Sequence, residues 1–205
     1  MIKRFKKMEV AREDTVKVRV NGEEVTLLCT PCMLKELGAG VAATKFGLCN
    51  VRRVDVRDRE VEVTASKLVS RPKRLEKLTE KLNLKELEES LDLLDVKEYR
   101  KTRGYHIAVA IRNGEVIARS YDVSRHCVLA KVIGGAILRG AMEGYYIVFS
   151  GRISRSIVEM CSRAGVNLIV SKAAIFDSAI DMCLKSGVGA VSFATGVAVN
   201  VDLVI

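Results

Sequence analysis

Three cationic side chains and a histidine gather in the stretch Tyr121–Ser156, where they could bind an anion. Arg125, His126 and Lys131 begin a segment with helical periodicity, and Arg152 follows a short apolar run. The pattern predicts two strand-to-helix junctions that carry these residues. Free backbone N–H groups and the positive dipole end at a helix N-terminus suit a phosphate. We therefore predict an anion site, and two exposed basic loops are the alternative reading.

Three of the six cysteines could do sulfur chemistry. Cys29 and Cys32 form a C-x-x-C, in which one thiol can have a lowered pKa and carry sulfane sulfur as a thiolate. The C-x-x-C could also be half of a zinc site, but this alternative is weaker because a second C-x-x-C or a nearby histidine pair is missing. Two structural thiols are as good an explanation as a catalytic pair. Cys127 directly follows Arg125 and His126, where a cationic helix start favours a thiolate; a buried helix cysteine is the alternative. The others read as core residues: Cys49, Cys161 and Cys183.

Length and composition predict a protein that buries a sizeable core. The chain has 205 residues, of which 49% are apolar, and a net charge of +9 that is spread along it. The apolar run 127–138 is too short to span a membrane and contains Lys131. Scattered cysteines favour reduced thiols, so we expect a cytoplasmic protein without a membrane partner. The basic residues 1–10 read as a solvated tail in preference to a nucleic-acid arm.

The first half of the chain predicts two hairpins and several helices. Alternating residues flank the Asn21-Gly22 turn between 15 and 30, and a second hairpin is expected at 51–65. Between them, 34–46 predicts a helix whose glycines allow close packing. The charged, leucine-spaced segment 70–98 predicts two short amphipathic helices, with Asn83 opening the second as part of a capping box. This segment is either a solvated face on the core or a docking site for a partner helix.

The second half predicts an α/β fold. A hairpin at 106–123 leads into the central helix, whose buried stripe consists of Val128, Leu129, Val132, Ile133, Ile137 and Leu138. Strands and helices then alternate in a βαβαβ unit, which implies parallel strands with covering helices. The expected elements are strand 145–150, helix 153–164, strand 167–172, helix 176–186 and strand 190–195.

Five ordered motifs in this half resemble those of the FdhD family of formate dehydrogenase accessory proteins. The motifs are TRGYHIAVA (102–110), DVSRHCVLAKVIG (122–134), SGRIS (150–154), SKAAIFDSA (171–179) and TGVAVNV (195–201). They are similar to the family patterns TGGxHxAA, DVGRHNALDKVIG, SGRxS, SRSAPTxxA and GxxxNVY. Upstream, residues 20–48 resemble VNGxxxxxxRTPxDxxELAxGFLxxEG, and the likeness lapses in 65–101.

The resemblance implies a fold and a domain organisation. The expected fold is a three-layer α/β sandwich with a mixed sheet, like that of cytidine deaminases, beside a smaller β-rich N-terminal lobe. Deaminase zinc chemistry is not expected, because the H-x-E and P-C-x-x-C signature is missing. We predict a β-rich lobe with one helix at 1–69, a charged helical insert at 70–101, and an α/β cofactor-binding domain at 102–205.

The resemblance also implies a ligand and its site. The family binds a molybdenum or tungsten pterin guanine dinucleotide as its client, and no intrinsic metal is expected. Matching positions give the cofactor-binding residues His106, Arg125, His126, Lys131, Ser150, Gly151, Arg152 and Ser154. Chemically, Arg125 and Arg152 can each fork onto a pyrophosphate, and Lys131 can act as a point charge. A glycine at 151 would let backbone approach the ligand, whereas His126 could equally be structural.

Several positions depart from the family pattern. Ser124 replaces the glycine before Arg, Cys127 an asparagine and Ala130 an aspartate, and Ile175-Phe176 stands for proline-threonine. The sulfur-carrying CGxCG-type loop is missing, since residues 50–126 contain no cysteine. The C-x-x-C at Cys29 instead overlays the RTP segment. If sulfur transfer survives, Cys29, Cys32 or Cys127 must carry the persulfide.

These observations lead to one functional hypothesis and an alternative from another class. We predict an accessory protein that binds the pterin-dinucleotide cofactor and delivers sulfur to it from a cysteine desulfurase, before the cofactor enters formate dehydrogenase. A non-catalytic chaperone or carrier of the cofactor is the alternative. A nucleotide-binding enzyme ranks last because neither a P-loop nor a GxGxxG is present. The expected partners are formate dehydrogenase, the desulfurase and a second copy of the chain, without nucleic acid.

Overall fold

The two N-terminal hairpins form one four-stranded sheet. In this computed structural model, which describes residues 7–68, 82–141 and 144–204, the sheet has the order β2-β1-β4-β3, and its central strands β1 and β4 are parallel. The predicted turn places Asn21 and Gly22 at positive φ, at 49° and 90°. The strands are β1 (Asp14–Val20), β2 (Glu23–Cys29), β3 (Asn50–Arg57) and β4 (Glu60–Ser66).

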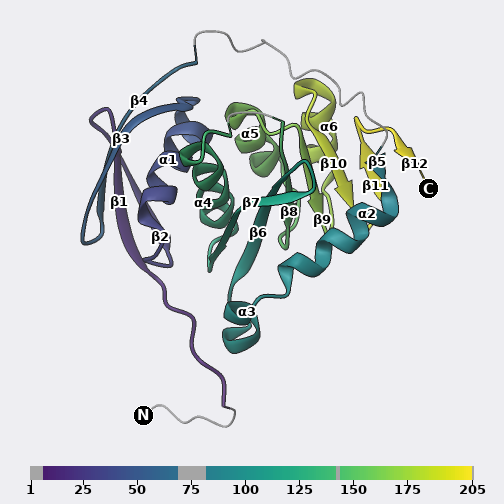
Figure 1. Ribbon diagram of the computed structural model, residues 1–205, viewed down its shortest axis with the longest axis horizontal. Helices are drawn as coiled ribbons and strands as arrows, with labels where there is room; N and C mark the ends of the chain where they lie inside the picture. Colours follow the sequence, from purple (N-terminus) through teal and green to yellow (C-terminus); the bar gives the residue numbers. More distant parts are fainter. Residues whose placement is uncertain (1–6, 69–81, 142–143, 205) are drawn as a thin grey trace.

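A backbone-to-backbone helix contact joins this sheet to the rest of the molecule. Helix α1 (Leu34–Phe46) lies between the sheet and helix α4 (Arg125–Leu138) (Figure 1). A Cβ at Gly40 would lie 1.7 Å from the carbonyl oxygen of Ala130, and one at Gly134 would lie 1.9 Å from that of Glu36. The close packing expected of the α1 glycines is thus confirmed, and Gly134 is its counterpart on α4.

A mixed six-stranded sheet forms the centre of the second half. Its order is β11-β10-β9-β8-β6-β7, in which β8, β9 and β10 are parallel and β6 runs antiparallel to both of its neighbours. The short strand β11, which the sequence did not predict, lies antiparallel to β10 at the edge. The strands are β6 (His106–Arg112), β7 (Glu115–Asp122), β8 (Tyr146–Phe149), β9 (Leu168–Ser171), β10 (Gly189–Ser192) and β11 (Val197–Val199).

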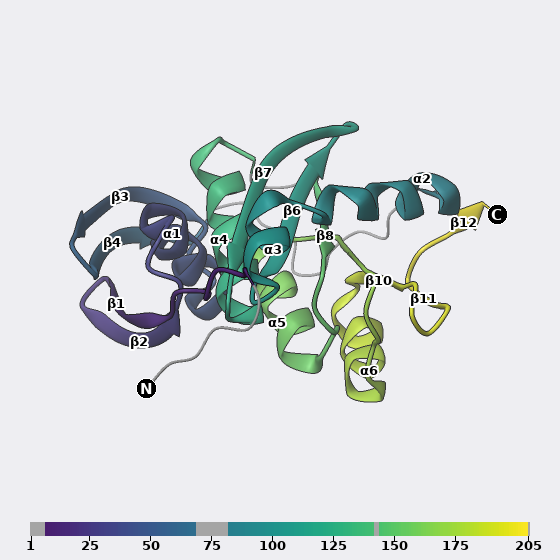
Figure 2. The same cartoon turned by 90° about the horizontal axis from the view of Figure 1, so that it is seen from below.

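Helices cover both faces of this sheet, so the predicted three-layer α/β sandwich with a smaller β-rich lobe is confirmed. Helix α4 packs on one face with α5 (Arg155–Ala164) and α6 (Asp177–Ser186). The other face is covered by α2 (Leu84–Glu89), the 3-10 helix η1 (Ser90–Leu94) and α3 (Lys97–Thr102). Figure 2 shows α2 and α6 on opposite sides of the strands, with the N-terminal sheet at one end.

The charged segment 70–98 is partly described. Residues 69–81, where the first of the two predicted helices falls, lie outside the described residues. The predicted cap is present, since the Asn83 side chain accepts hydrogen bonds from the backbone N–H groups of Lys85 and Glu86. The leucine-spaced face packs on the central sheet through Leu87 and Leu94. Asn83 itself belongs to β5 (Leu82–Asn83), which pairs in parallel with β12 (Leu203–Val204).

One local expectation was wrong. Leu138 is 45% exposed, because α4 ends there and the chain turns away from the core, so the predicted buried stripe ends at Ile137. Of the basic residues 1–10, only 7–10 are described; Val10 is 79% exposed, and the Glu9 N–H donates to the carbonyl oxygen of Lys101 at 3.0 Å. Among the described residues, no helix combines the length and the apolar character that crossing a membrane requires.

Candidate functional site

The polar residues of interest lie along one edge of the six-stranded sheet. Strands β7, β8 and β9 end there at Asp122, Phe149 and Ser171, and β6 begins there at His106. Helices α4, α5 and α6 all start at this edge, because each follows a strand that ends there. The carboxyl ends of parallel strands are where open α/β sheets bind ligands. The predicted gathering of two strand-to-helix junctions is therefore present at this edge.

His106 begins β6, which lies between β7 and β8 in the sheet. Its Nδ1 is 3.5 Å from the Ser150 hydroxyl, which accepts a hydrogen bond from the backbone N–H of Ile107 at 2.8 Å. Burial lowers the pKa of His106, and the positive charge of Arg125 lowers it further. Asp122 raises it by less than Arg125 lowers it, and Arg152 adds a still smaller lowering effect. His106 is therefore favoured as a neutral imidazole among cations, where a bound anion would raise its pKa.

A cavity of about 250 Å³ opens beside this histidine. Its lining includes two cations, Arg103 and Lys172, together with His106 and Ser150. The cations lie over one aromatic ring, because the Arg103 guanidinium carbon is 4.9 Å and the Lys172 ammonium 5.5 Å from the centroid of Tyr99. An anion that entered this cavity would meet positive charge and hydrogen-bond donors together.

The two arginines predicted to bind the ligand have no carboxylate partner among the described residues. The Arg152 guanidinium lies 5.7 Å from the Phe176 ring centroid, and within the described ranges neither Arg125 nor Arg152 is within 4.0 Å of an acidic group. The carboxylate of Asp95, whose charge acts on the same region, is held by a two-bond pair with Arg100. These arginines therefore keep their forked donors for a ligand such as a pyrophosphate, so the residues present fit a dinucleotide.

A second group of donors surrounds the first turns of α4 and α5. The Nε2 atom of His126 is 2.9 Å from the Ser156 hydroxyl, which is 3.0 Å from that of Ser154. Burial lowers the pKa of His126, and Arg125 adds to the effect. Ser124 caps α4 by accepting a hydrogen bond from the Cys127 N–H at 3.4 Å, so this departure from the family glycine serves the helix start.

Two predicted binding residues have structural partners. Lys131 is fully buried, and its ammonium donates to Asp122 at 2.5 Å and to the Thr30 carbonyl oxygen at 2.8 Å. A Cβ at Gly151 would lie 2.5 Å from the ring of Phe149, so this glycine makes room for a side chain of its own protein. Whether either residue also contacts a ligand stays a prediction.

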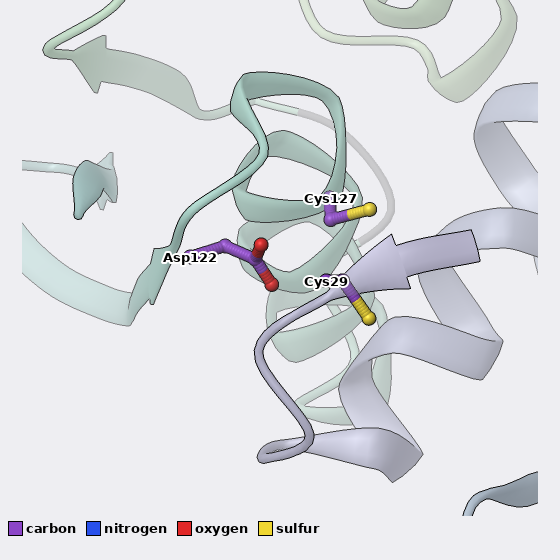
Figure 3. A group of neighbouring side chains, drawn as sticks. All are labelled: Cys29, Asp122 and Cys127. Carbon is purple, nitrogen blue, oxygen red and sulfur yellow. The ribbon is translucent and has the colours of Figure 1, made fainter. Parts of the chain in front are cut away.

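Three elements bring two of the candidate cysteines together. Cys29 ends β2, Cys127 lies in the first turn of α4, and Asp122 ends β7 (Figure 3). Their sulfur and oxygen atoms all lie within 4.8 Å of one another, and all three residues are buried. Cys32, the other half of the C-x-x-C, is half-buried outside this group, with its Sγ 3.8 Å from the Lys131 ammonium. The predicted core positions of the other cysteines are confirmed: Cys49, Cys161 and Cys183 are buried.

The surroundings of the two thiols shift their pKa values in opposite directions. The contact with Cys127, followed by burial, raises the pKa of Cys29. The same contact lowers the pKa of Cys127, the Ser124 hydroxyl adds to that effect, and burial opposes it. Asp122 is poorly placed to bind a metal together with them, because its oxygens already accept from the Lys131 ammonium and from the Thr30 and Ser124 N–H groups.

Sequence reasoning missed the residues that complete the site. Asp122 was read only as a strand end, although a carboxylate just before a helix that carries Lys131 could have signalled an ion pair. The sequence pattern did not indicate three further residues, because only the fold brings them to this edge: Ser156, Arg103 and Lys172.

The fold is an α/β sandwich whose sheet carries cationic and hydroxyl side chains at its carboxyl edge, with a thiol pair beside them. The model of the FdhD/NarQ family matches residues 60–201, and the chain belongs to this family. A "sulfur carrier protein FdhD" of Shouchella clausii is 26% identical over 94% of this chain and 86% of its own length. One from Methanothermobacter thermautotrophicus is 36% identical, over 50% of this chain and 40% of its own.

A solved structure shares the fold. A crystal structure from Desulfotalea psychrophila, described as a formate dehydrogenase accessory protein, superposes with a TM-score of 0.77 at 22% identity. The superposition covers 91% of this chain and 84% of that one. Both the N-terminal sheet and the sandwich are thus within the shared architecture.

Proposed function

We propose that this chain is an accessory protein of formate dehydrogenase that binds a molybdenum or tungsten pterin guanine dinucleotide and passes sulfur to it. The observation that carries the proposal is the carboxyl edge, where Arg125 and Arg152 lie near His106 without a carboxylate partner among the described residues. The relatives named as sulfur carriers support the sulfur-handling part. A cysteine desulfurase as donor, a homodimer and a cytoplasmic location belong to the same proposal.

Each group at the edge has a role in this proposal. The two arginines bind the pyrophosphate of the dinucleotide through forked donors, and the neutral His106 and the Ser150 hydroxyl orient it. Ser154 and Ser156 offer hydroxyls beside the start of α5. When bound, the cofactor supplies the metal that accepts sulfur. The buried thiols lie behind this edge, next to the Lys131–Asp122 pair.

A second candidate, a carrier without sulfur chemistry, is favoured by one observation. Cys29 is fully buried and Cys127 is 4% exposed, so neither thiol lies open to a partner protein. In this case the anion site alone would account for the function, and the thiols would be packing residues.

Maturation of formate dehydrogenase tests both candidates. In a host without its own FdhD protein, co-expression of the chain with the dehydrogenase should restore formate oxidation. Arg152→Ala should reduce it about tenfold or more, since a charge-assisted hydrogen bond contributes about 1.5–3 kcal/mol. Arg139→Ala is the matched control, because Arg139 lies after the other end of α4 and its guanidinium donates to the Gly135 carbonyl oxygen of its own helix.

The thiol variants then separate the two candidates. Full activity of a chain with Cys29→Ser, Cys32→Ser and Cys127→Ser would establish the carrier without sulfur chemistry. If Arg152→Ala restores formate oxidation as well as wild type does, the anion site that both candidate functions require is contradicted.

A further inference from the structure

The contact between Cys29 and Cys127 joins two parts of the chain that are far apart in sequence. Cys29 belongs to the N-terminal sheet and Cys127 to the first turn of α4, and their Sγ atoms are within 4.8 Å. A disulfide has an S–S distance of about 2.0 Å, so rotation of the two side chains has to bring the sulfurs together. The two thiols are therefore neighbours, and a disulfide bond is not formed between them in this structure.

Cys127 and Cys29 differ in their access to a cavity that the described residues enclose. Cys127 lines an apolar cavity of about 230 Å³, whose wall includes Leu27, Ala130 and Met160, whereas Cys29 does not line it. This volume holds a small sulfur species beside the Cys127 thiol. A donor sulfur would therefore meet Cys127 first, with Cys29 behind it.

Hydrogen bonds at the pair favour the thiolate on Cys127. Asp122 raises the pKa of both thiols, and the Lys131 ammonium, one turn further along α4, opposes it with a smaller effect. The Cys29 contact and the Ser124 hydroxyl favour the Cys127 thiolate, and Cys29 is kept as the protonated partner. Cys127 is thus the nucleophile for the incoming sulfur, and Cys29 keeps its proton until a later step.

We propose that Cys127 accepts a sulfane sulfur as a persulfide and that Cys29 resolves it, so that the sulfur leaves as hydrosulfide. The proposal rests on the sulfur-carrying function proposed above and names its residues. It differs from a C-x-x-C mechanism, because Cys32 is not part of the reacting pair. Hydrosulfide is at the oxidation level that a metal accepts as a sulfido ligand, whereas sulfane sulfur is not.

Sulfur uptake and hydrosulfide release are two steps that conserve atoms and electrons. In the first, the Cys127 thiolate attacks the outer sulfur of a donor persulfide, whose S–S bond breaks and whose thiolate leaves. In the second, the Cys29 sulfur attacks Cys127 Sγ, the bond from Cys127 to the sulfane sulfur breaks, and hydrosulfide leaves with the bonding electrons and the Cys29 proton. The sulfane sulfur gains two electrons, and the two thiols lose two as they form a disulfide. A dithiol reductant restores the thiols.

The test uses the full chain and inorganic polysulfide as the donor. The reduced protein is loaded without oxygen, excess donor is removed by gel filtration, and released hydrosulfide is followed while peptides are mapped by mass spectrometry. Wild type should release hydrosulfide and gain a disulfide between residues 29 and 127, which a sample without donor should lack. Cys29→Ser should hold one extra sulfur on Cys127 and release about tenfold less.

The remaining variants test which cysteine accepts the sulfur. Cys127→Ser should take up about tenfold less sulfur, while Cys32→Ser and the core control Cys161→Ser should behave as wild type. Sulfur on Cys32 with Cys127 unlabelled would overturn the proposal, as would release by wild type without the disulfide. Binding of guanosine diphosphate distinguishes failure of this proposal from failure of the proposed function. If the protein binds the nucleotide but its thiols take up no sulfur, the resolving pair is refuted and the proposed anion site is not.

Discussion

Lys131 shows at the scale of single residues how the site is built. The sequence pattern predicts a charge for a ligand, but the ammonium is buried and connects β7, through Asp122, to the Thr30 carbonyl oxygen after β2. Periodicity could place Lys131 on a buried helix, yet it could not name a partner, because the partner depends on where β2 ends in space. A buried ion pair with further hydrogen bonds is costly to break from one side, since the remaining charge loses its partner.

Removal of one partner should therefore destabilise the protein strongly. Lys131→Met should lower the free energy of unfolding by about 3–5 kcal/mol, because Asp122 is left as an unpaired buried carboxylate. The control Arg53→Ala breaks the pair with Asp55, in which the arginine side chain is 73% exposed, and should cost about 1 kcal/mol or less. Urea unfolding followed by circular dichroism measures both. Equal losses would show that the buried pair contributes no more than a surface one.

At the scale of elements, the sequence predicted most helices and strands because each carries its own boundary signals. Asn21-Gly22 sets the first turn and Asn83 caps α2, so these boundaries are local properties. The contact of α1 with α4 is different. The glycines of 34–46 predicted only that some backbone comes close, without naming the helix that does so. The structure uses Gly134 internally, against Gly40 and the Glu36 carbonyl oxygen.

A methyl group at Gly134 should force the two helices apart. Gly134→Ala should lower the free energy of unfolding by about 1–3 kcal/mol or more, since the added carbon would lie 1.9 Å from a backbone oxygen that cannot rotate away. The neighbouring Gly135→Ala is the matched control. Its nearest atom is the Ala118 Cβ at 3.2 Å, and the helix propensity of alanine offsets part of that crowding. Equal stability of the two variants by urea unfolding would contradict the close contact.

At the scale of the whole molecule, function depends on residues that only the fold brings together. The motifs predicted the anion site because its arginines directly follow strands, and parallel strands end at one edge. The thiol pair could not be predicted, because Cys29 ends strand β2, Cys127 lies in helix α4, and their contact depends on the packing of α1 against α4. The division of the chain at residues 69 and 101 stays a prediction.

Binding of guanosine diphosphate to the isolated protein tests the central claim, that the carboxyl edge is an anion site for a dinucleotide. Calorimetry should show saturable binding to wild type that weakens as salt is added, and an affinity about tenfold or more lower for Arg152→Ala. Arg139→Ala should bind as wild type does. No binding to wild type at about millimolar nucleotide, or equal binding to Arg152→Ala, would contradict the account.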